Sequence, residues 1–261
     1  MRPEVYQQVF SVQTQHWWGR SRRKLSVDLL KRFGLPQRCA HLDVGCGTGQ
    51  NLGLLDGLTP LRVVGMDISP DALRLAREAC PGCELVQSDI NRTFPFPDGM
   101  FDVATIYNVL YHVWIESEVS VLREVRRALK TSGLLLITEP TFPILSRDLD
   151  VAGMGKRRYR LPQFIEMLKA AGFDVVFSNY FTSFGPPIIL AGKAIKSILP
   201  QRKSADAVEA ADLRPMNPLL NGMFYALARA EALLVSASIP IPFGTTLICV
   251  ARPSKSTSNP Q

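Results

Sequence analysis

The residues best suited to hold a ligand are three glycines that follow one apolar run, with an acid just before the first of them. They lie in the segment Leu42–Gln50, which reads Leu-Asp-Val-Gly-Cys-Gly-Thr-Gly-Gln. Glycine allows positive φ angles and lets a ligand come closer to the backbone than a Cβ would permit. Open α/β sheets hold cofactors where a buried strand leads into a helix, so this turn is the first candidate for a binding site.

The spacing of these glycines distinguishes two kinds of cofactor. A dinucleotide site needs the pattern G-x-G-x-x-G, and Gln50 occupies its third glycine position here. The chain has D-x-G-x-G-x-G instead, with Asp43 ahead of the turn. An acid at that position suits a cofactor that brings a cation, because opposite charges attract. S-adenosylmethionine, with its α-ammonium and sulfonium groups, is such a cofactor.

Two further acids end apolar runs later in the chain. Asp67 ends the run that begins at Leu61, and Asp89 ends the run that begins at Leu85. The two oxygens of the Asp67 carboxylate match the vicinal hydroxyls of a ribose. One acid of this kind is usually a solvated loop residue, but three acids at successive strand ends around one glycine turn indicate a nucleoside site.

Together these segments resemble the class I S-adenosylmethionine-dependent methyltransferases, in the broad type 11 group that includes the ubiquinone and menaquinone methyltransferases. The resemblance covers residues 39–180, and its later motifs are Phe94–Val103, Asn108–His112, and Arg123–Lys130 followed by Gly133–Ile137. It implies that S-adenosylmethionine is the cofactor and that the third acid accepts from the adenine amino group. The cofactor contacts that it implies are Asp43, Gly45, Cys46, Gly47, Thr48, Gly49, Asp67, Ile68, Asp89, Ile90 and Asn108.

His112 is the candidate for a general base, because histidine has an unperturbed pKa of about 6.5. It follows the fourth strand, beside the expected methyl-transfer centre, and Tyr111 next to it is a candidate substrate contact. Family members often have an acid where Asn108 stands, which puts a charge-dependent role of that position in doubt. The alternative is that His112 caps a helix or packs, since methyl transfer needs no strong base when the acceptor is well placed.

The segment Gln15–Arg23 has two tryptophans before a cluster of arginines. It resembles the N-terminal helix of bacterial methyltransferases, where that helix folds over the cofactor. By this resemblance Arg20 binds the methionine carboxylate and Trp17 or Trp18 walls the pocket, with Tyr6 in the same lid as a substrate contact. The alternative is that the segment only packs against the domain.

A second basic cluster, Lys156–Arg160, follows the fifth strand, where relatives recognise their substrates. Its positive charge suits a phosphate or carboxylate on the acceptor, with Arg157, Arg158 and Tyr159 as the contacts. A basic loop that is merely solvated is the alternative.

The alternation of apolar runs with amphipathic ones predicts an α/β fold, a Rossmann-like sheet of seven strands with helices on both faces. The expected strands lie near 40–44, 62–66, 84–87, 101–106, 134–138, 173–180 and 245–251. The expected helices lie near 49–57, 70–79, 116–130 and 161–171. The chain then divides into a helical N-terminal extension or lid (1–38), the cofactor-binding core (39–180), a helical insert (181–244), and the last strand with a disordered tail (245–261).

The insert separates two strands that usually form a hairpin. It holds two helix candidates, Ile188–Leu199 and Asn217–Ser236, joined by a polar linker. The first is largely apolar and carries Lys193 and Lys196, which suits a cationic helix at a membrane surface. A substrate lid, a contact in a homodimer and an extra layer packed on the core are the alternatives.

Composition narrows the class of protein further. The chain has 261 residues and a net charge of +7, which favours an anionic partner without requiring one. Its five scattered cysteines argue for a reducing compartment and against a disulfide framework. The pair in Cys80-Pro81-Gly82-Cys83 could be a redox or zinc pair, but no further ligands lie nearby, which favours an ordinary turn and a protein without a bound metal.

The polar N-terminus shows no secretory signal, and no apolar run is long enough to span a membrane. We therefore expect a cytoplasmic protein.

These features predict an enzyme that transfers a methyl group to an oxygen, nitrogen or carbon of a small molecule. The aromatic N-terminus and apolar insert favour a partly apolar acceptor, such as a natural product of secondary metabolism, an isoprenoid or a lipid. The alternatives are a catalytically silent scaffold that keeps the cofactor fold and, less favoured, an NAD-dependent oxidoreductase. No base-flipping motif follows the fourth strand, where Asn108–Tyr111 stands, so a nucleic acid substrate is not expected.

Overall fold

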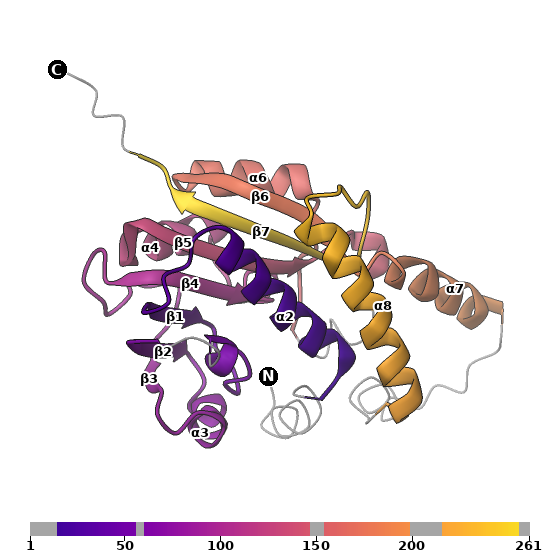
Figure 1. Cartoon of the computed structure of the whole chain (residues 1–261), viewed down its shortest axis with the longest axis horizontal. Coiled ribbons are helices and arrows are strands. Elements are labelled where there is room, and N and C mark those ends of the chain that lie inside the picture. The colour runs from indigo at the N-terminus through magenta and orange to yellow at the C-terminus, as the bar shows by residue number, and fades with distance from the viewer. Residues whose placement is uncertain (1–14, 56–59, 147–153, 199–215, 256–261) are drawn as a thin grey trace.

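Seven strands form one sheet in the computed structural model of the chain, which describes residues 15–55, 60–146, 154–198 and 216–255 (Figure 1). The strand order is β3-β2-β1-β4-β5-β7-β6, and β7 runs antiparallel to both of its neighbours. The strands are β1 (Ala40–Val44), β2 (Arg62–Asp67), β3 (Glu84–Gln87), β4 (Phe101–Tyr107), β5 (Leu129–Pro140), β6 (Phe173–Phe181) and β7 (Thr246–Pro253). The predicted fold is confirmed, including the pairing of the last two strands.

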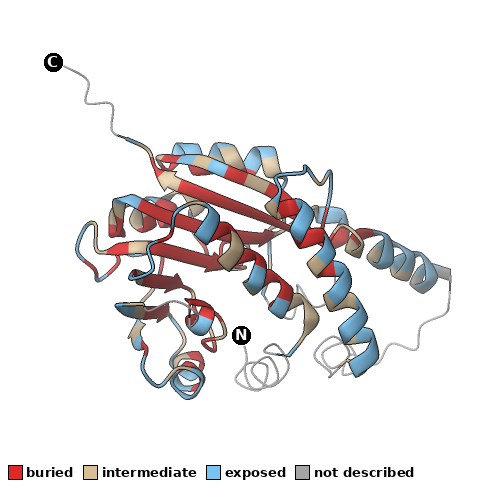
Figure 2. Ribbon diagram, in the orientation of Figure 1, coloured by how far each residue is buried: buried red, intermediate tan, exposed pale blue. Residues whose placement is uncertain are grey.

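The two central strands, β1 and β4, are buried on both faces, as the red ribbons in the middle of the sheet show (Figure 2). Their residues are mostly apolar and pair in parallel, for example Leu42 with Ala104 and Val44 with Ile106. Because the strand order reverses between β1 and β4, the loops at their carboxyl ends diverge and leave room for a ligand. The sheet thus sets the glycine turn at its ligand-binding edge.

Helices cover both faces of the sheet. On one face α2 and α8 lie side by side, and their Leu29 and Val235 belong to the same apolar cluster (Figure 1). The other face is covered by α4 and α6, through Leu122 and Phe164. The helices are α2 (Trp17–Arg32), α3 (Pro70–Ala79), α4 (Glu118–Ala128), α6 (Leu161–Ala170), α7 (Gly185–Ile198) and α8 (Pro218–Ser236), with two short 3-10 helices, η1 (Leu52–Leu55) and η2 (Pro143–Leu145).

The two helices of the insert behave differently. α8 begins after Asn217, whose side chain accepts from the N–H groups of the first turn, and packs along α2 as an extra layer. α7 instead extends away from the sheet (Figure 1). No helix among the described residues is both long and apolar enough to cross a bilayer. The polar linker and the tail beyond residue 255 lie outside the described residues.

Two expected boundaries were wrong. The helix expected near 49–57 is only η1, since three glycines fall within those nine residues and Gly49 has a positive φ of 82°. The helix expected to reach residue 130 ends at Ala128, because Leu129 already has extended backbone angles and begins β5. β5 is therefore longer at its start than the apolar run suggested.

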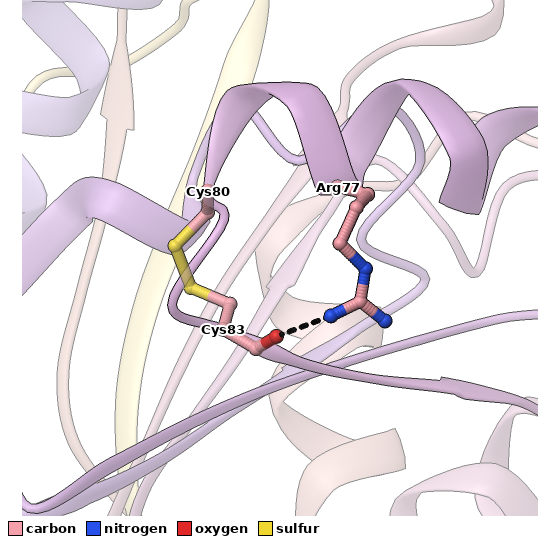
Figure 3. Close-up of a disulfide and its surroundings, with 3 residues drawn as sticks. All are labelled: Arg77, Cys80 and Cys83. Atoms are coloured by element: carbon pink, nitrogen blue, oxygen red, sulfur yellow. Dashed lines mark hydrogen bonds between the residues drawn. A yellow bond between two sulfur atoms is a disulfide. The ribbon is translucent and has the colours of Figure 1, made fainter.

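Cys80 and Cys83 form a disulfide, which corrects the expectation of an ordinary turn (Figure 3). α3 ends at Ala79, and the following Pro-Gly turn brings the two cysteine Cα atoms to 5.4 Å, within reach of a disulfide. The guanidinium of Arg77 donates to the carbonyl oxygen of Cys83 at 3.1 Å and ties the turn to the helix. The bridge is local, because its two cysteines are only three residues apart. The other three cysteines, Cys39, Cys46 and Cys249, are free and buried.

Candidate functional site

A cleft of about 210 Å³ lies at the carboxyl ends of β1, β2, β3 and β4. It is lined by Trp18, Arg22, Gly45, Cys46, Gly47, Thr48, Asp67, Ile68, Asp89, Ile90, Tyr107, Asn108, Val109, Tyr111, His112 and Trp114. Most of the residues expected to contact a cofactor are therefore brought together, although they come from four separate strand ends. A wider hollow of about 520 Å³ between α3 and β3 contains none of the expected site residues.

The glycine turn is held open by backbone hydrogen bonds. The N–H groups of Gly45 and Cys46 both donate to the carbonyl oxygen of Met66, at 2.7 and 3.0 Å. Gly47 has a φ of 53°, and a Cβ built there would meet nothing within 4 Å, so its backbone is open to a ligand. Gly49 has another purpose: its Cβ would lie 2.8 Å from the Cα of Ala76, so this glycine lets the turn pack on α3 and does not line the cleft.

Both oxygens of Asp67 are oriented by backbone N–H groups. Oδ2 accepts from Gly47 at 2.8 Å and Oδ1 accepts from Ser69 at 2.9 Å. Burial raises the pKa of Asp67, while these hydrogen bonds oppose the shift. Each carboxylate oxygen can accept a second hydrogen bond, so the group can still receive two hydroxyls.

The third acid and two isoleucines form the far end of the cleft. Asp89 is fixed by its own loop, because Oδ1 accepts from the backbone and side-chain nitrogens of Asn91 at 2.9 Å. Ile90 is buried, whereas Ile68 is half exposed. Both line the cleft and supply apolar surface to a flat ring.

Asp43 is buried at the start of the glycine turn and does not line the cleft, so it could reach a ligand only through the turn or a water. Its Oδ1 accepts from the Thr105 hydroxyl at 2.7 Å, and Nε2 of His41 lies 2.8 Å from the same hydroxyl oxygen. Since that hydroxyl proton points to Asp43, Nε2 of His41 is the donor to it. Burial raises the pKa of Asp43 to about 7 and lowers the pKa of His41 to about 4. Through Thr105 the acid links β1 to β4 just before the turn.

The N-terminal helix faces the cleft with the second of the two expected tryptophans and with a different arginine from the one expected. Trp17 packs against Phe184 and Phe224, and the exposed Arg20 lies 4.2 Å from the ring of Tyr225 on α8. Trp18 and Arg22 line the cleft instead. Positions 18 and 22 share one helix face and positions 17 and 20 another, so Arg22 and not Arg20 lies on the same face as Trp18. The positions of tryptophans and arginines in the sequence do not determine which face of α2 turns toward the cleft.

Arg22 is a buried cation at the floor of the cleft. It is 5% exposed, and its guanidinium carbon lies 4.1 Å from the ring centroid of Trp18 and 4.7 Å from that of Tyr107. Burial lowers the pKa of Arg22 to about 10, although the charges of Asp43 and Glu139 oppose the shift. Within the described residues its Nε and Nη1 atoms are buried without a hydrogen-bond partner. Buried donors are normally satisfied, so this side chain is prepared to bind an anion.

The loop after β4 is held by Glu139, which sequence analysis missed. Asn108 has a positive φ of 55°, and the next two N–H groups, of Val109 and Leu110, donate to Glu139 Oε1 at 3.0 and 2.8 Å. Burial raises the pKa of Glu139 to about 8, although those N–H groups favour its charged form. The available signal was an acid at the end of an apolar run, the same signal that identified Asp67.

That loop carries an aromatic wall. The ring of His112 stacks on Trp114 with centroids 4.2 Å apart, and the ring of Tyr111 lies 4.1 Å from His112 on the other side. All three line the cleft. The wall therefore contains both residues expected there, His112 and Tyr111, together with Trp114, which the sequence did not single out.

The basic cluster after β5 supports this wall from behind and does not line the cleft, which corrects its expected place. Arg157 donates to the carbonyl oxygens of His112 and Ile115 at 2.8 and 3.0 Å and pairs with Glu118 at 2.9 Å. Arg158 donates to the carbonyl oxygen of Thr141 at 2.9 Å. Tyr159 is buried, and its hydroxyl donates to the carbonyl oxygen of Leu110 at 2.9 Å. Tyr6, the remaining expected contact, lies outside the described residues.

Among the described residues, no group of three or more histidine, cysteine or acidic side chains could hold a metal ion. The cleft instead offers one buried cation, two carboxylates, open backbone and aromatic rings. This set can bind a zwitterionic nucleoside derivative and exclude water from a reacting centre.

Comparison with known proteins also points to methyltransferases. Residues 42–137 match the family described as "Methyltransferase domain". The chain is 34% identical over 120 residues to a trans-aconitate 2-methyltransferase of Azoarcus, which covers 46% of each chain. It is 28% identical over 246 residues to a protein of the same name from Methylobacterium nodulans, covering 87% of this chain and 89% of the relative. In most of the curated relatives the matched part spans about half of the relative's own length.

Among solved structures, the crystal structure of the cyclase SpnF has a TM-score of 0.58 and 22% identity, covering 91% of this chain and 83% of that one. This likeness establishes the fold alone.

Proposed function

From the premise that residues 42–137 form a methyltransferase domain of the class I, S-adenosylmethionine-dependent type, we propose that this chain transfers a methyl group from that cofactor to a small-molecule acceptor. The observation that carries the proposal is the arrangement of Asp67, Asp89 and the open backbone of Gly47 around one cleft. A silent scaffold would have no need of an oriented carboxylate at each of two strand ends. The missing third glycine speaks against a dinucleotide.

The cleft residues divide into roles that follow from their chemistry. Asp67, with both oxygens oriented, would receive the two ribose hydroxyls, and Asp89 would accept from the adenine amino group between Ile68 and Ile90. Arg22, with its unsatisfied donors, would bind the methionine carboxylate, the role that the sequence suggested for Arg20.

When bound, S-adenosylmethionine supplies a methyl group on a sulfonium, which is already electrophilic. The chain has to hold the acceptor in line with that methyl group and keep water away. Tyr111, His112 and Trp114 stand on the side of the cleft where the acceptor would enter. We assign to His112 the removal of a proton from an oxygen or nitrogen acceptor.

The aromatic wall favours an acceptor with a flat or apolar part. Arg22 is the one arginine or lysine among the described lining residues, and the cofactor carboxylate would use it. The relatives named trans-aconitate 2-methyltransferase support a small organic molecule as acceptor. A natural product, an isoprenoid or a lipid-like molecule fits the aromatic wall better than a compact polyanion.

Cofactor binding is tested by calorimetry with S-adenosylhomocysteine and with NADH. We expect S-adenosylhomocysteine to bind and Asp67→Ala to weaken it about 100-fold, because two hydrogen bonds to a charged group are lost. The matched control is Asp71→Ala, an exposed acid at the start of α3 that should leave affinity unchanged. Tight binding of NADH without S-adenosylhomocysteine would refute the assignment.

Methyl transfer is tested separately, with methyl-labelled S-adenosylmethionine and a metabolite extract. Labelling of an extract component is expected, and His112→Asn should lower the rate about 100-fold, the usual contribution of a general base, without changing cofactor affinity. If the protein binds S-adenosylhomocysteine but labels nothing, it is a scaffold that keeps the fold.

A further inference from the structure

α7 is an apolar helix that is largely exposed. Of its described side chains, Ile188 is 54% exposed, Leu190 40% and Ile195 57%. Pale blue and tan cover the part of α7 that extends from the sheet in Figure 2. Lys193 donates to the carbonyl oxygen of Ile144 on η2 at 2.7 Å, and Ile144 is itself 67% exposed. Exposed apolar side chains that gather on one element commonly mark a surface that contacts a partner or a membrane.

α8 adds a second exposed apolar face. Leu220, Met223, Leu227 and Leu234 follow one another at helical spacing, and all four are exposed. A second face of α8, about 100° around the helix, carries Ala228 and Val235 and packs in the apolar cluster that includes α2. The helix therefore has two apolar faces, and the face with Ala228 and Val235 is the buried one.

These two helices are fixed to the edge of the sheet that carries the cleft. α7 begins four residues after β6 ends, and η2 follows the end of β5. The buried Glu231 of α8 accepts from the N–H of Ser183, just before α7, at 3.0 Å through each carboxylate oxygen. Both helices are thus anchored at one point, from which they diverge (Figure 1).

α7 carries only positive charges, and the one acid of α8 is buried. The sequence of α7 contains Lys193 and Lys196 and no acid. In α8 the single acid, Glu231, is buried, and Arg229 lies 3.6 Å from Asp28 of α2. Combined with a net charge of +7, these lysines suit an anionic surface.

We propose that the exposed faces of α7 and α8, together with Ile144, form a docking surface for an anionic lipid bilayer. The apolar side chains enter the boundary between headgroups and acyl chains, and the ammonium of Lys193, at the carbonyl oxygen of Ile144, stays at the level of the headgroups. A helix of 14 residues is too short to span a bilayer, so α7 lies in the interface. Docking brings the edge of the sheet with the cleft toward the lipid.

The test is flotation of the full chain with vesicles of phosphatidylcholine, with and without phosphatidylglycerol. Cofactor is left out, so the result does not depend on the proposed methyl transfer. We expect binding to the vesicles that contain phosphatidylglycerol, weaker binding without it, and a decrease with added salt. The double variant I188S/I195S should bind these vesicles at least about tenfold more weakly, because two apolar side chains that would be buried in the bilayer are lost.

The matched control is Leu61→Ser, a 60% exposed leucine beside the start of β2 at the opposite edge of the sheet, which should bind as the unchanged protein does. Unchanged circular dichroism and S-adenosylhomocysteine affinity would show that I188S/I195S is folded. Absence of binding to phosphatidylglycerol vesicles at low salt overturns the proposal, as does full binding by I188S/I195S. A dimer in light scattering that I188S/I195S converts to a monomer, without vesicle binding, assigns the surface to a second copy.

Discussion

The two walls of the cleft are built on different principles. The wall at the ends of β1, β2 and β3 presents backbone and short carboxylates, each oriented by neighbouring N–H groups, as Asp67 is by Gly47 and Ser69. The wall after β4 presents the large rings of Tyr111, His112 and Trp114 on a loop with no regular structure.

The difference lies in what holds each wall. Strand ends hold the first, and the sheet fixes their spacing. Two ionisable side chains hold the second: Glu139 receives the N–H groups at the start of the loop, and Arg157 donates to carbonyl oxygens nearer its end. Charged residues that could have bound a ligand are used here to shape the backbone, so we expect mutations in the two walls to have separable effects.

The largest effect should come from Arg22, which lies on α2 at the floor of the cleft, next to the wall formed by the strand ends. Arg22→Met should weaken S-adenosylhomocysteine binding about 100-fold, since charge-assisted hydrogen bonds to the methionine carboxylate are lost. Calorimetry with 5′-methylthioadenosine, which has no carboxylate, should show little change. The control is Arg20→Met, at the exposed arginine beside Tyr225, which should bind as before. Equal losses for the two ligands would mean that Arg22 only supports the fold.

A smaller effect is expected for Arg157, behind the acceptor wall. Arg157→Met removes two hydrogen bonds to loop carbonyls and the pair with Glu118, so the free energy of unfolding should fall by about 2 kcal/mol in urea titrations. Arg92→Met, at an arginine whose side chain is 74% exposed, should change it little. A rise in the acceptor KM at unchanged stability would restore the role in substrate binding that the sequence suggested.

Per unit of pH, the smallest effect concerns the protonation of Glu139. Its pKa is raised from the ordinary value to about 8, so the folded state holds this proton more tightly than the unfolded state does. Stability is therefore lost as the pH rises from about 4.5 to about 8. Glu139→Gln keeps an accepting oxygen but does not titrate. The difference in unfolding free energy between this variant and the unchanged protein should therefore shift in favour of the variant by about 1 kcal/mol for each pH unit over that range. Parallel pH profiles for the two proteins would show that Glu139 is not perturbed.

The sequence identified the cofactor wall well because its signals are local. A glycine turn after an apolar strand, and acids at the ends of the next two strands, need only the rule that parallel strands end at one edge. It identified the acceptor wall in part: His112 and Tyr111 follow β4 directly, whereas Arg157 and Arg158 stood out by charge and turned out to bind backbone carbonyls. A cluster of basic residues indicates an anion-binding site only when its N–H groups do not already donate to nearby carbonyl or carboxylate oxygens.

The sequence by itself determined the order of strands and helices, the glycine turn and the acids that meet at one edge of the sheet. The spacing of apolar residues and the residue types that form turns are both encoded over a few neighbouring positions. Only the tertiary structure decided which face of α2 meets the cleft, that Glu139 holds the loop after β4, and that α7 is left exposed. These outcomes depend on how distant segments pack. A rotation of about 100° per residue along a helix separates a ligand contact from a packing residue one position away.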